Sequence, residues 1–535
     1  MKDAGRNLPG KSSKDLSLLR DHGLPHLNPD PQDRGPQYLE DLATGYWFSE
    51  VLFTAVETRV FTRLDSGSNG LHELSDAFDF DPGGLERFLG ALCALKLVIR
   101  DGSQYYNSKI ASEYLVIGKE KYQGNSILWR KELFSKWTGL KDCLRSGGRA
   151  GNDSSDDSER AEGIRRYINA MDCIARTKVK EILPLFEGLS FDGKMLDIGA
   201  GSGAIAVGFL SQMPFLKATL IDIPEVLDYT RELIQERGLG ERSSFTAANI
   251  LEPWPEDAER YDLVVLSNII HAYSEKELPH ILASASRCLN QQGFLVIHDF
   301  FLEHYPEKAA LFDLNMFINT YNGRVFSCLP MKEELEALRL YTTGLIPLGT
   351  DTALIIASRT SERLTELRLD PKTRLTARLG DLGFRGAKVI SVGSIHVADW
   401  TDSRCRYGCG HYGKPHCPPF SVPPEKTRKI LADYRHAILL EGEPPTREFQ
   451  LRVLEAEKEA FKAGFYKAFA FWAGPCSLCS SCTTDGTCRN TKEARPSMEA
   501  AGIDVFETVR NAGGRLRTLE RRGDFVKYYG LLLLE

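Results

Sequence analysis

The stretch MLDIGAGSGAIA, residues 195–206, predicts a strand, a tight glycine turn and the start of a helix. Its pattern is Asp197-x-Gly199-x-Gly201-x-Gly203. Glycine lets the backbone turn sharply and lets a ligand approach the loop closely. Loops of this kind hold several different cofactors, so the acidic residues near the loop decide between them.

Two acids near the glycine loop favour S-adenosylmethionine over a dinucleotide, which stays the alternative. Asp197 ends the strand before the loop, where a carboxylate repels a pyrophosphate but suits the amino group of a methionine. Asp222 ends the next strand, about twenty residues past the loop, where an acid can accept both ribose hydroxyls. Asn249 and Ile250 follow the next predicted strand, where the amide would bond the adenine amine and Ile250 would pack on the ring.

Apolar segments alternate with helical stretches between residues 163 and 360. The segments that predict strands are KMLDIG, KATLID, YDLVVLS, GFLVIHD and TALIIAS. Such alternation predicts an α/β domain, with a doubly wound parallel sheet covered by helices on both faces.

His271 is the candidate general base. It lies in YDLVVLSNIIHAYSEKELPHIL, residues 261–282, after a predicted buried strand and before a helix that the capping box Ser274–Glu277 would open. Ligands of open α/β sheets bind beyond the carboxyl ends of such strands, and the alternative is a surface or capping histidine. Asp299 ends the following strand and would orient the imidazole. Neutral His271 would take a proton from a phenol, enol or thiol that attacks the methyl group.

Residues 36–146 predict the outline of a winged helix. After an amphipathic helix come two short helices, a strand, a turn at Asp101-Gly102 and a second strand. Within residues 71–108, which include the two short helices and the hairpin, acidic residues outnumber basic ones about two to one, which does not suit a phosphate backbone. We therefore expect a packing or dimerisation module, with no nucleic acid bound.

Changes of composition divide the rest of the chain. Residues 1–35 predict a mobile arm, and the Gly-, Ser- and Asp-rich stretch GGRAGNDSSDDSER predicts a linker over 147–162. The sheet domain then covers 163–360. A segment rich in Cys, Gly and Pro follows over 361–535, and we expect it to be an α+β metal domain.

The 535 residues are 42% hydrophobic and 26% charged, with a net charge of −6. The N-terminus lacks the apolar core of a signal peptide, and no apolar run is long enough to span a bilayer. We expect a cytoplasmic protein without a membrane partner, in which the twelve cysteines are thiols or metal ligands.

Seven of the cysteines form two groups near the C-terminus. The second group, Cys476-x2-Cys479-x2-Cys482-x5-Cys488, resembles the [4Fe–4S] ligand run of bacterial ferredoxins, although its last spacing is longer; zinc is the alternative. The first group supplies three thiols, from Cys405, Cys409 and Cys417. His411 or His416 would complete a site there, or the three thiols would hold a second cluster with one open iron, or zinc. The other five cysteines are scattered, as is typical of small buried side chains.

Residues 36–360 resemble the O-methyltransferases of the caffeate and hydroxyindole type. The matching stretches are LATGYWFSEVLFTAVETRVF, LERFLGALCALKLV, DIGAGSG, LIDIPEVL and IIHAYSEKE. The resemblance implies a homodimer formed through a winged-helix domain, a Rossmann-like catalytic domain, and a small-molecule methyl acceptor. It implies His271 as the catalytic base and Asp299 as its supporting acid.

The same resemblance implies an acceptor pocket lined by FDLNMFIN, and so by Met316 and Asn319. The family usually has Asp where this chain has Asn249. Its second catalytic acid has no clear counterpart here, with Glu333 as the candidate, which leaves the acceptor atom open.

Residues 370–535 resemble a predicted metal-binding domain of unknown function from anaerobic bacteria and archaea. The stretches that carry this resemblance are CRYGCGHYGKPHCPP, GPCSLCSSC and CRNTKEARPSMEAAGIDVFETV. The resemblance implies a metal but no reaction.

Together these patterns predict an S-adenosylmethionine-dependent methyltransferase that acts on a hydroxyl or thiol of a small molecule. The attached iron–sulfur domain would have a structural, redox or acceptor-binding role, with an electron donor as partner if it is redox-active. The alternatives are a metal- or redox-responsive regulator that uses the winged helix, and an electron-transfer protein on a methyltransferase scaffold. The identity of the acceptor and the number of clusters stay open.

Overall fold

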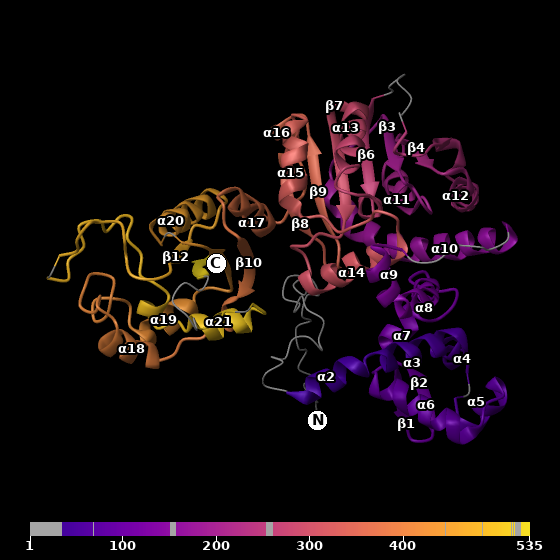
Figure 1. The fold of residues 1–535 in the computed structure, drawn as a ribbon, viewed down its shortest axis with the longest axis horizontal. Helices are drawn as coiled ribbons and strands as arrows, with labels where there is room; N and C mark the ends of the chain where they lie inside the picture. Colours follow the sequence, from indigo (N-terminus) through magenta and orange to yellow (C-terminus); the bar gives the residue numbers. More distant parts are fainter. Residues whose placement is uncertain are drawn as a thin grey trace, which may run out of the picture. The chain divides into compact units, whose positions relative to one another are not determined.

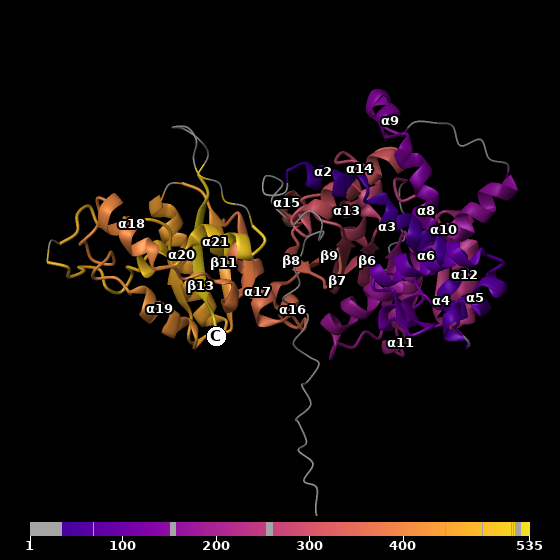
Figure 2. The same ribbon diagram turned by 90° about the horizontal axis from the view of Figure 1, so that it is seen from below.

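The computed structural model describes residues 35–535 except 68, 150–156, 253–259, 445, 484, 515, 517 and 519–525. Nearly all of the predicted arm over 1–35, and the middle of the predicted linker, lie outside the described residues. The chain divides into two compact units at Arg368 and Leu369, drawn in Figures 1 and 2. Within the described part of the chain, no helix is both long and apolar enough to cross a membrane.

The N-terminal part has the helix–helix–hairpin order that the sequence predicts. Asp81 begins the second helix of this motif by accepting a 2.7 Å hydrogen bond from the backbone nitrogen of Gly84. The hairpin turns between Asp101 and Gln104. The elements in order are α2 (Pro36–Ala43), α3 (Tyr46–Glu57), α4 (Val60–Asp65), α5 (Leu71–Phe78), α6 (Pro82–Ala94), β1 (Val98–Asp101), β2 (Gln104–Asn107), α7 (Lys109–Tyr114), α8 (Gly124–Thr138) and α9 (Leu140–Ser146).

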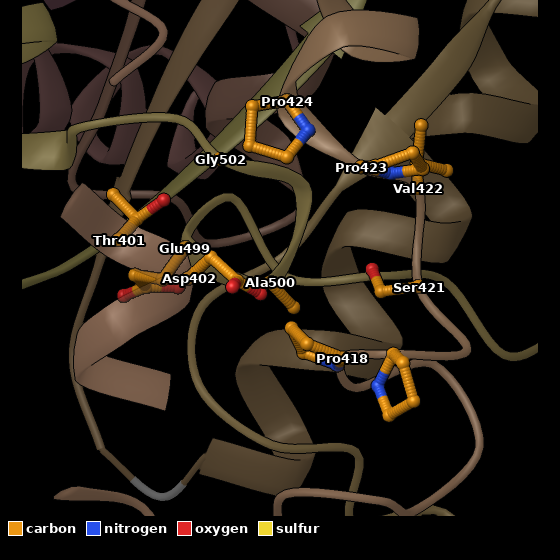
Figure 3. Close-up of a pocket in the computed structure, with 11 residues that line it drawn as sticks. Thr401, Asp402, Pro418, Ser421, Val422, Pro423, Pro424, Glu499, Ala500 and Gly502 are labelled. Carbon is orange, nitrogen blue, oxygen red and sulfur yellow. The ribbon is translucent and has the colours of Figure 1, made fainter. Parts of the chain in front are cut away.

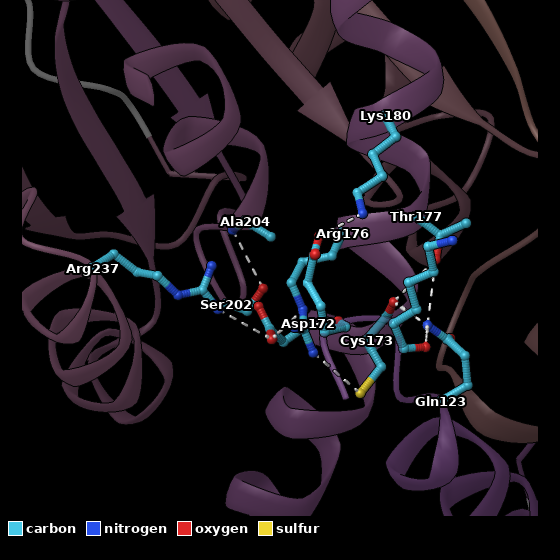
Figure 4. Close-up of polar contacts among 11 residues, drawn as sticks. Gln123, Asp172, Cys173, Arg176, Thr177, Lys180, Ser202, Ala204 and Arg237 are labelled. Carbon is cyan, nitrogen blue, oxygen red and sulfur yellow. Dashed lines mark hydrogen bonds and ion pairs between the residues drawn. The ribbon is translucent and has the colours of Figure 1, made fainter. Parts of the chain in front are cut away.

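The long helix α10 (Asp157–Ile182) begins inside the predicted linker and joins the N-terminal part to the sheet domain. Asp172 is buried on it, with Arg176 Nε at 2.9 Å and Arg237 at 3.7 Å (Figure 4). Gln123, just before α8, donates to the carbonyl of Cys173 at 3.0 Å. These polar contacts connect the two parts within one unit.

The sheet domain contains seven strands, and all five predicted strand segments are among them. They are β3 (Lys194–Ile198), β4 (Lys217–Asp222), β5 (Ser243–Ala247), β6 (Tyr261–Ser267), β7 (Leu289–Asp299), β8 (Tyr341–Pro347) and β9 (Ala353–Ser358). Their order in the sheet is β5-β4-β3-β6-β7-β9-β8. The prediction of a parallel sheet holds from β5 to β7. It is wrong for β9, the segment TALIIAS, which pairs antiparallel with both β7 and β8.

All six residues of β9 are buried, and successive residues of a strand point to opposite faces of its sheet. Both faces of this sheet are therefore covered, as in other α/β domains with helices on both sides. On one side, Phe186 meets Phe209 and Phe294 edge to face at 5.2 and 5.7 Å. The remaining helices of this unit are α11 (Ala204–Gln212), α12 (Pro224–Glu236), α13 (Leu278–Cys288), α14 (Pro306–Asn319), α15 (Cys328–Ala337) and α16 (Ser361–Thr365).

The C-terminal unit is built on a four-stranded antiparallel sheet. Its elements are α17 (Pro371–Asp381), β10 (Gly386–Ser391), α18 (Trp400–Gly408), α19 (Pro424–Leu431), β11 (His436–Gly442), α20 (Thr446–Lys462), β12 (Phe469–Phe471), α21 (Val505–Asn511) and β13 (Tyr528–Leu533). The strand order is β10-β11-β13-β12.

Alternate residues of β11 and β13 enter different cores of this unit. Ile438 and Leu532 join the core that contains Phe449 of α20. Leu439 and Leu531 join the one that contains Val509 of α21. This sheet therefore has helices on both faces.

Candidate active site

The glycine loop connects β3 to α11 in a backbone shape that only glycine adopts easily. Gly199, Gly201 and Gly203 all have positive φ, of 66°, 55° and 73°. A Cβ on Gly199 would come within 2.6 Å of the side chain of Ile269, whereas one on Gly201 would meet no described atom within 4 Å. Ile269 lies two residues before His271, so the loop that follows β6 packs directly on the glycine loop.

Asp197, at the end of β3, is an almost fully buried carboxylate with 1% of its surface exposed. Among the described residues, its Oδ2 has no hydrogen-bond partner. Burial raises the pKa of Asp197 to about 7, against a smaller opposing effect of the backbone of Ala206. A buried acid with one unpaired oxygen is stabilised by a cationic group, which restores its ionised form.

Asp222, at the end of β4, holds the glycine loop from the neighbouring strand. Its Oδ2 accepts a 2.9 Å hydrogen bond from the nitrogen of Gly201, and its Oδ1 accepts one of 2.8 Å from Ile223. Burial raises the pKa of Asp222, while these two backbone donors act in the opposite direction. Each oxygen keeps a lone pair that a hydroxyl group can use.

Asn249 and Ile250 follow β5, and their side chains have different surroundings. Asn249 is exposed, and its Oδ1 accepts a 3.1 Å hydrogen bond from the nitrogen of Leu251. Ile250 is 5% exposed and belongs to the apolar core of the sheet domain. A role for Ile250 beside an adenine ring stays a prediction, because its packing is already explained by that core.

His271 and Asp299 lie together at the carboxyl ends of β6 and β7. His271 is on the short 3₁₀ helix η3 (Ile270–Ala272), and its Nδ1 is 2.6 Å from Asp299 Oδ1. Asp299 is fully buried and also accepts a hydrogen bond from the nitrogen of Phe300, whereas the His271 side chain keeps 15% of its surface exposed. The carboxylate therefore fixes one ring nitrogen and leaves Nε2 for another partner.

A buried histidine fixes the strand ends beneath this pair. His298 Nδ1 is 2.8 Å from Ser267 Oγ, and its Nε2 is 2.8 Å from Thr352 Oγ1. Burial lowers the pKa of His298 to about 3, so its ring is neutral. His298, the residue before Asp299 on β7, thus connects this strand to Ser267 at the end of β6 and to Thr352 just before β9. No sequence pattern predicted this role.

The aromatic side chains of Phe300 and of Phe312, which is on α14, lie beside His271. Phe300 and Phe312 stack at 3.7 Å between ring centroids, and Phe312 meets the His271 ring edge to face at 5.2 Å. Met316 is 7% exposed. Asn319 donates to the carbonyl of Asn315 at 2.9 Å, and its own buried Oδ1 has no hydrogen-bond partner in the described part of the chain.

Asn315 connects this helix to α8. Its Oδ1 accepts a 3.0 Å hydrogen bond from Trp137 Nε1. No local sequence pattern joins residues 178 positions apart, so the role of Trp137 was missed. Phe300 and Phe312 were missed because an apolar residue beside a strand end or on a helix is typical of core packing.

One expectation near His271 needs correction, and another stays untested. The Glu277 carboxylate accepts from the backbone nitrogen of Ser274 at 2.8 Å, as in a capping box, but the Ser274 hydroxyl donates to the same carboxylate and α13 begins only at Leu278. Glu333 is exposed on α15 and shares no hydrogen bond or ion pair with His271 among the described residues. Its role as a second catalytic acid stays a prediction.

The cysteines of the second group gather around one cavity in the C-terminal unit. Cys476, Cys479, Cys482 and Cys488 all line it, together with His416 from the first group. Within the described ranges, no group of three or more His, Cys, Asp or Glu side chains has the geometry of a metal site. The four thiols are of the chemical type that binds zinc or an iron–sulfur cluster. Their sulfur atoms do not have the mutual arrangement of metal ligands in the described part of the chain.

The first group lies near the second. Burial raises the pKa of the Cys417 thiol to about 11, and thiols from both groups add to this rise, namely those of Cys409, Cys405, Cys482 and Cys476. A different pocket adjoins the first group and is lined by Asp402, Glu499 and Ser421 among others (Figure 3). Both of these carboxylates help to raise the pKa of Cys405, after the larger effects of burial and Cys409.

Known protein families match all three parts of the chain. Residues 147–332 match the O-methyltransferase domain, and residues 40–117 match the O-methyltransferase dimerisation domain. Residues 388–534 match a family described as predicted metal-binding protein (DUF2284). With the sheet topology, these matches define a methyltransferase that uses S-adenosylmethionine. The chain carries the two domains of the O-methyltransferase family, followed by a DUF2284 domain.

Individual relatives agree with this assignment. The 3-hydroxy-5-methyl-1-naphthoate 3-O-methyltransferase of Streptomyces sahachiroi is 27% identical over 56% of this chain and 87% of its own length. The acetylserotonin O-methyltransferase of Bos taurus is 26% identical over 54% of this chain and 88% of its own. The crystal structure of human N-acetylserotonin methyltransferase shares the fold, with a TM-score of 0.54 and 23% identity over 62% of this chain and 99% of that one.

Proposed function

We propose that this protein moves a methyl group from S-adenosylmethionine to a hydroxyl group of a small molecule, with His271 as the general base. The observation that carries the proposal is the 2.6 Å contact between His271 Nδ1 and the buried carboxylate of Asp299. This contact holds the ring by Nδ1 and orients its Nε2 for proton transfer. We propose a homodimer through the N-terminal domain.

The cofactor would lie along the carboxyl ends of β3, β4 and β5. Asp197 would receive its ammonium group, since that carboxylate is buried with one unpaired oxygen. Asp222 would accept the ribose hydroxyls, and the glycine loop, including Gly199, Gly201 and Gly203, would lie against the ligand. Asn249 and Ile250 would border the adenine.

The chemistry then needs few steps from the chain. Bound S-adenosylmethionine supplies an electrophilic methyl group on a sulfonium. His271 Nε2 takes the proton of the acceptor hydroxyl while that oxygen attacks the methyl carbon, and the carbon–sulfur bond breaks with its electrons on sulfur. Phe300, Phe312, Met316 and Asn319 would border the acceptor, which favours a flat, partly apolar molecule with a hydrogen-bond donor.

The test is His271→Ala against the matched control His280→Ala, since His280 is exposed on α13. With a panel of phenols that includes N-acetylserotonin and a hydroxynaphthoate, formation of S-adenosylhomocysteine should fall about 10²- to 10⁴-fold only for His271→Ala. Binding of S-adenosylmethionine, measured by calorimetry, should stay unchanged in both variants. A His271→Ala enzyme with normal turnover would remove His271 as the base.

We also propose that Cys476, Cys479, Cys482 and Cys488 hold a [4Fe–4S] cluster. Their spacing, their shared cavity and the description of the matched family support this. Protein purified without oxygen should contain iron and sulfide in similar amounts and should lose both with Cys476→Ser. Colourless protein with stoichiometric zinc would contradict the cluster.

A further inference from the structure

We propose that His416, although it comes from the first cysteine group, is a positioning residue of the metal centre held by the second group. It would donate a hydrogen bond to a metal-bound thiolate there, and it would not complete a site with Cys405, Cys409 and Cys417. The inference rests on the proposed metal centre and names a residue that supports it.

The first observation is the composition of the cavity wall. His416 lines the same cavity as all four cysteines of the second group, although the whole of 417–475 separates it from them in sequence. The described residues that line the cavity do not include Cys405, Cys409 or Cys417. His416 therefore lines the cavity of the second group, to which no thiol of its own group contributes a lining residue among those described.

The second observation is the state of the ring itself. His416 Nε2 is buried and has no hydrogen-bond partner among the described residues. A buried ring nitrogen without a partner is unfavourable unless a ligand supplies one. Thiolate sulfur bound to a metal accepts N–H hydrogen bonds, and such bonds adjust the stability and potential of the centre.

The backbone holds the ring in this place. His416 has a φ of +62°, which histidine adopts more readily than most residues but still rarely. The next residue, Cys417, donates to the carbonyl of Lys414 at 3.0 Å, and Gly413 donates to the carbonyl of Pro418 at 2.8 Å. The loop is thus closed by its own backbone, with Cys417 in electrostatic range of thiols from both groups.

His411 differs from His416 and serves as the control. Its Nδ1 is 3.3 Å from Lys414 Nζ, and it is not one of the described residues that line the cavity. A substitution there changes a histidine of the same loop without changing the cavity wall.

The two substitutions of His416 differ in which ring nitrogen, Nδ1 or Nε2, the new amide can replace. His416→Asn tolerates the left-handed backbone and keeps an amide near Nδ1, but it cannot reach the place of Nε2. His416→Gln places its amide nitrogen near that of Nε2. Each is made in the full chain and also in a chain with Cys405, Cys409 and Cys417 all replaced by Ser.

The measurement is the rate at which anaerobically purified protein loses metal to a chromogenic chelator, which applies to iron and zinc alike. We expect His416→Asn to lose metal about 10- to 100-fold faster than the unaltered chain, in both backgrounds. His416→Gln should recover most of the slow rate, and His411→Asn should match the unaltered chain. Circular dichroism confirms that each variant is folded.

Three outcomes separate the possibilities. An unchanged rate for His416→Asn in a chain that holds metal would overturn the inference and leave the metal centre intact. An effect that disappears in the triple-Ser background would assign His416 to the first group and overturn it too. A chain that holds no metal before any substitution would contradict the proposed centre and, with it, this inference.

Discussion

The site around His271 and the cysteine region hold their functional side chains in different ways. Asp299 ends β7 and His271 lies on the short helix η3 that follows the neighbouring strand β6, with 2.6 Å between Nδ1 and Oδ1. The cysteines of the second group lie on a stretch between β12 and α21 that runs mainly as turns and loops where it is described, and Cys479 is exposed.

The energy that positions the side chains has a different source in each region. A sheet domain with helices on both faces places the His271 site through its own core, before any ligand binds. A thiol site on loops depends on the metal for its order, because the free energy of metal binding also stabilises the folded arrangement of the ligands. The unpaired buried atoms agree with this contrast, since Asp197 Oδ2 belongs to a rigid strand end and His416 Nε2 to a loop.

Metal removal should give the largest effect and should change the thermal stability of the cysteine region alone. Each compact unit has its own core, so we expect separate thermal transitions by calorimetry. Chelation should lower the transition of residues 369–535 by about 10 °C or more, since several kcal/mol are lost and each is worth about 2–4 °C. The transition of residues 24–368 should not move.

The matched control for metal removal is Cys476→Ser with Cys479→Ser, which should already show the lower transition and should not respond to the chelator. If both transitions moved together, the two regions would not differ in the way proposed here.

Asp197→Asn should give the next largest effect, on the cofactor. If the buried carboxylate receives the ammonium group, its loss should weaken S-adenosylmethionine binding by about 2–5 kcal/mol, as for other buried charge pairs. Calorimetric titration measures this, with Glu333→Gln as the exposed control. An affinity within twofold of the unaltered protein would place the ammonium group elsewhere.

The same carboxyl group should make stability depend on pH when no cofactor is present. Its folded pKa of about 7 lies above the usual value near 3.9, so the folded chain keeps a proton that the unfolded chain has lost. Stability should therefore fall as pH rises from about 4 to about 7, by at most about 4 kcal/mol. The amide of Asp197→Asn cannot titrate, so the free energy of unfolding of this variant should rise relative to that of the unaltered protein as pH increases from about 4 to about 7, measured by urea unfolding.

The sheet and its site were predictable because they obey local rules. KMLDIG, YDLVVLS and GFLVIHD are buried on both faces, and such continuous apolar runs predict parallel strands. Parallel strands end at one edge, so Asp197, His271 and Asp299 were expected at the same edge from their positions alone. The antiparallel β8 was missed, because YTTGLIP contains Gly344 and Pro347, which weaken a strand pattern.

The cysteine region could be predicted as a donor set but not as an arrangement. Spacing identified the four thiols of the second group, yet it offered His411 and His416 equally as partners of the first group. Only the folded loop places His416 in the second group's cavity. Contacts between loops distant in sequence follow no period, so neither helical nor strand patterns reveal them.

Trp137→Phe should give the smallest effect and refine the comparison within the first unit. It removes the 3.0 Å hydrogen bond to Asn315 but keeps an aromatic ring between α8 and α14. A single hydrogen bond is worth about 1 kcal/mol, so the KM for the acceptor should rise about fivefold while kcat stays within about twofold. Trp129→Phe, on the same helix but edge to face with Tyr167, is the control and should leave KM unchanged. A fall in kcat without a change in KM would mean that α8 acts on the base rather than on acceptor binding.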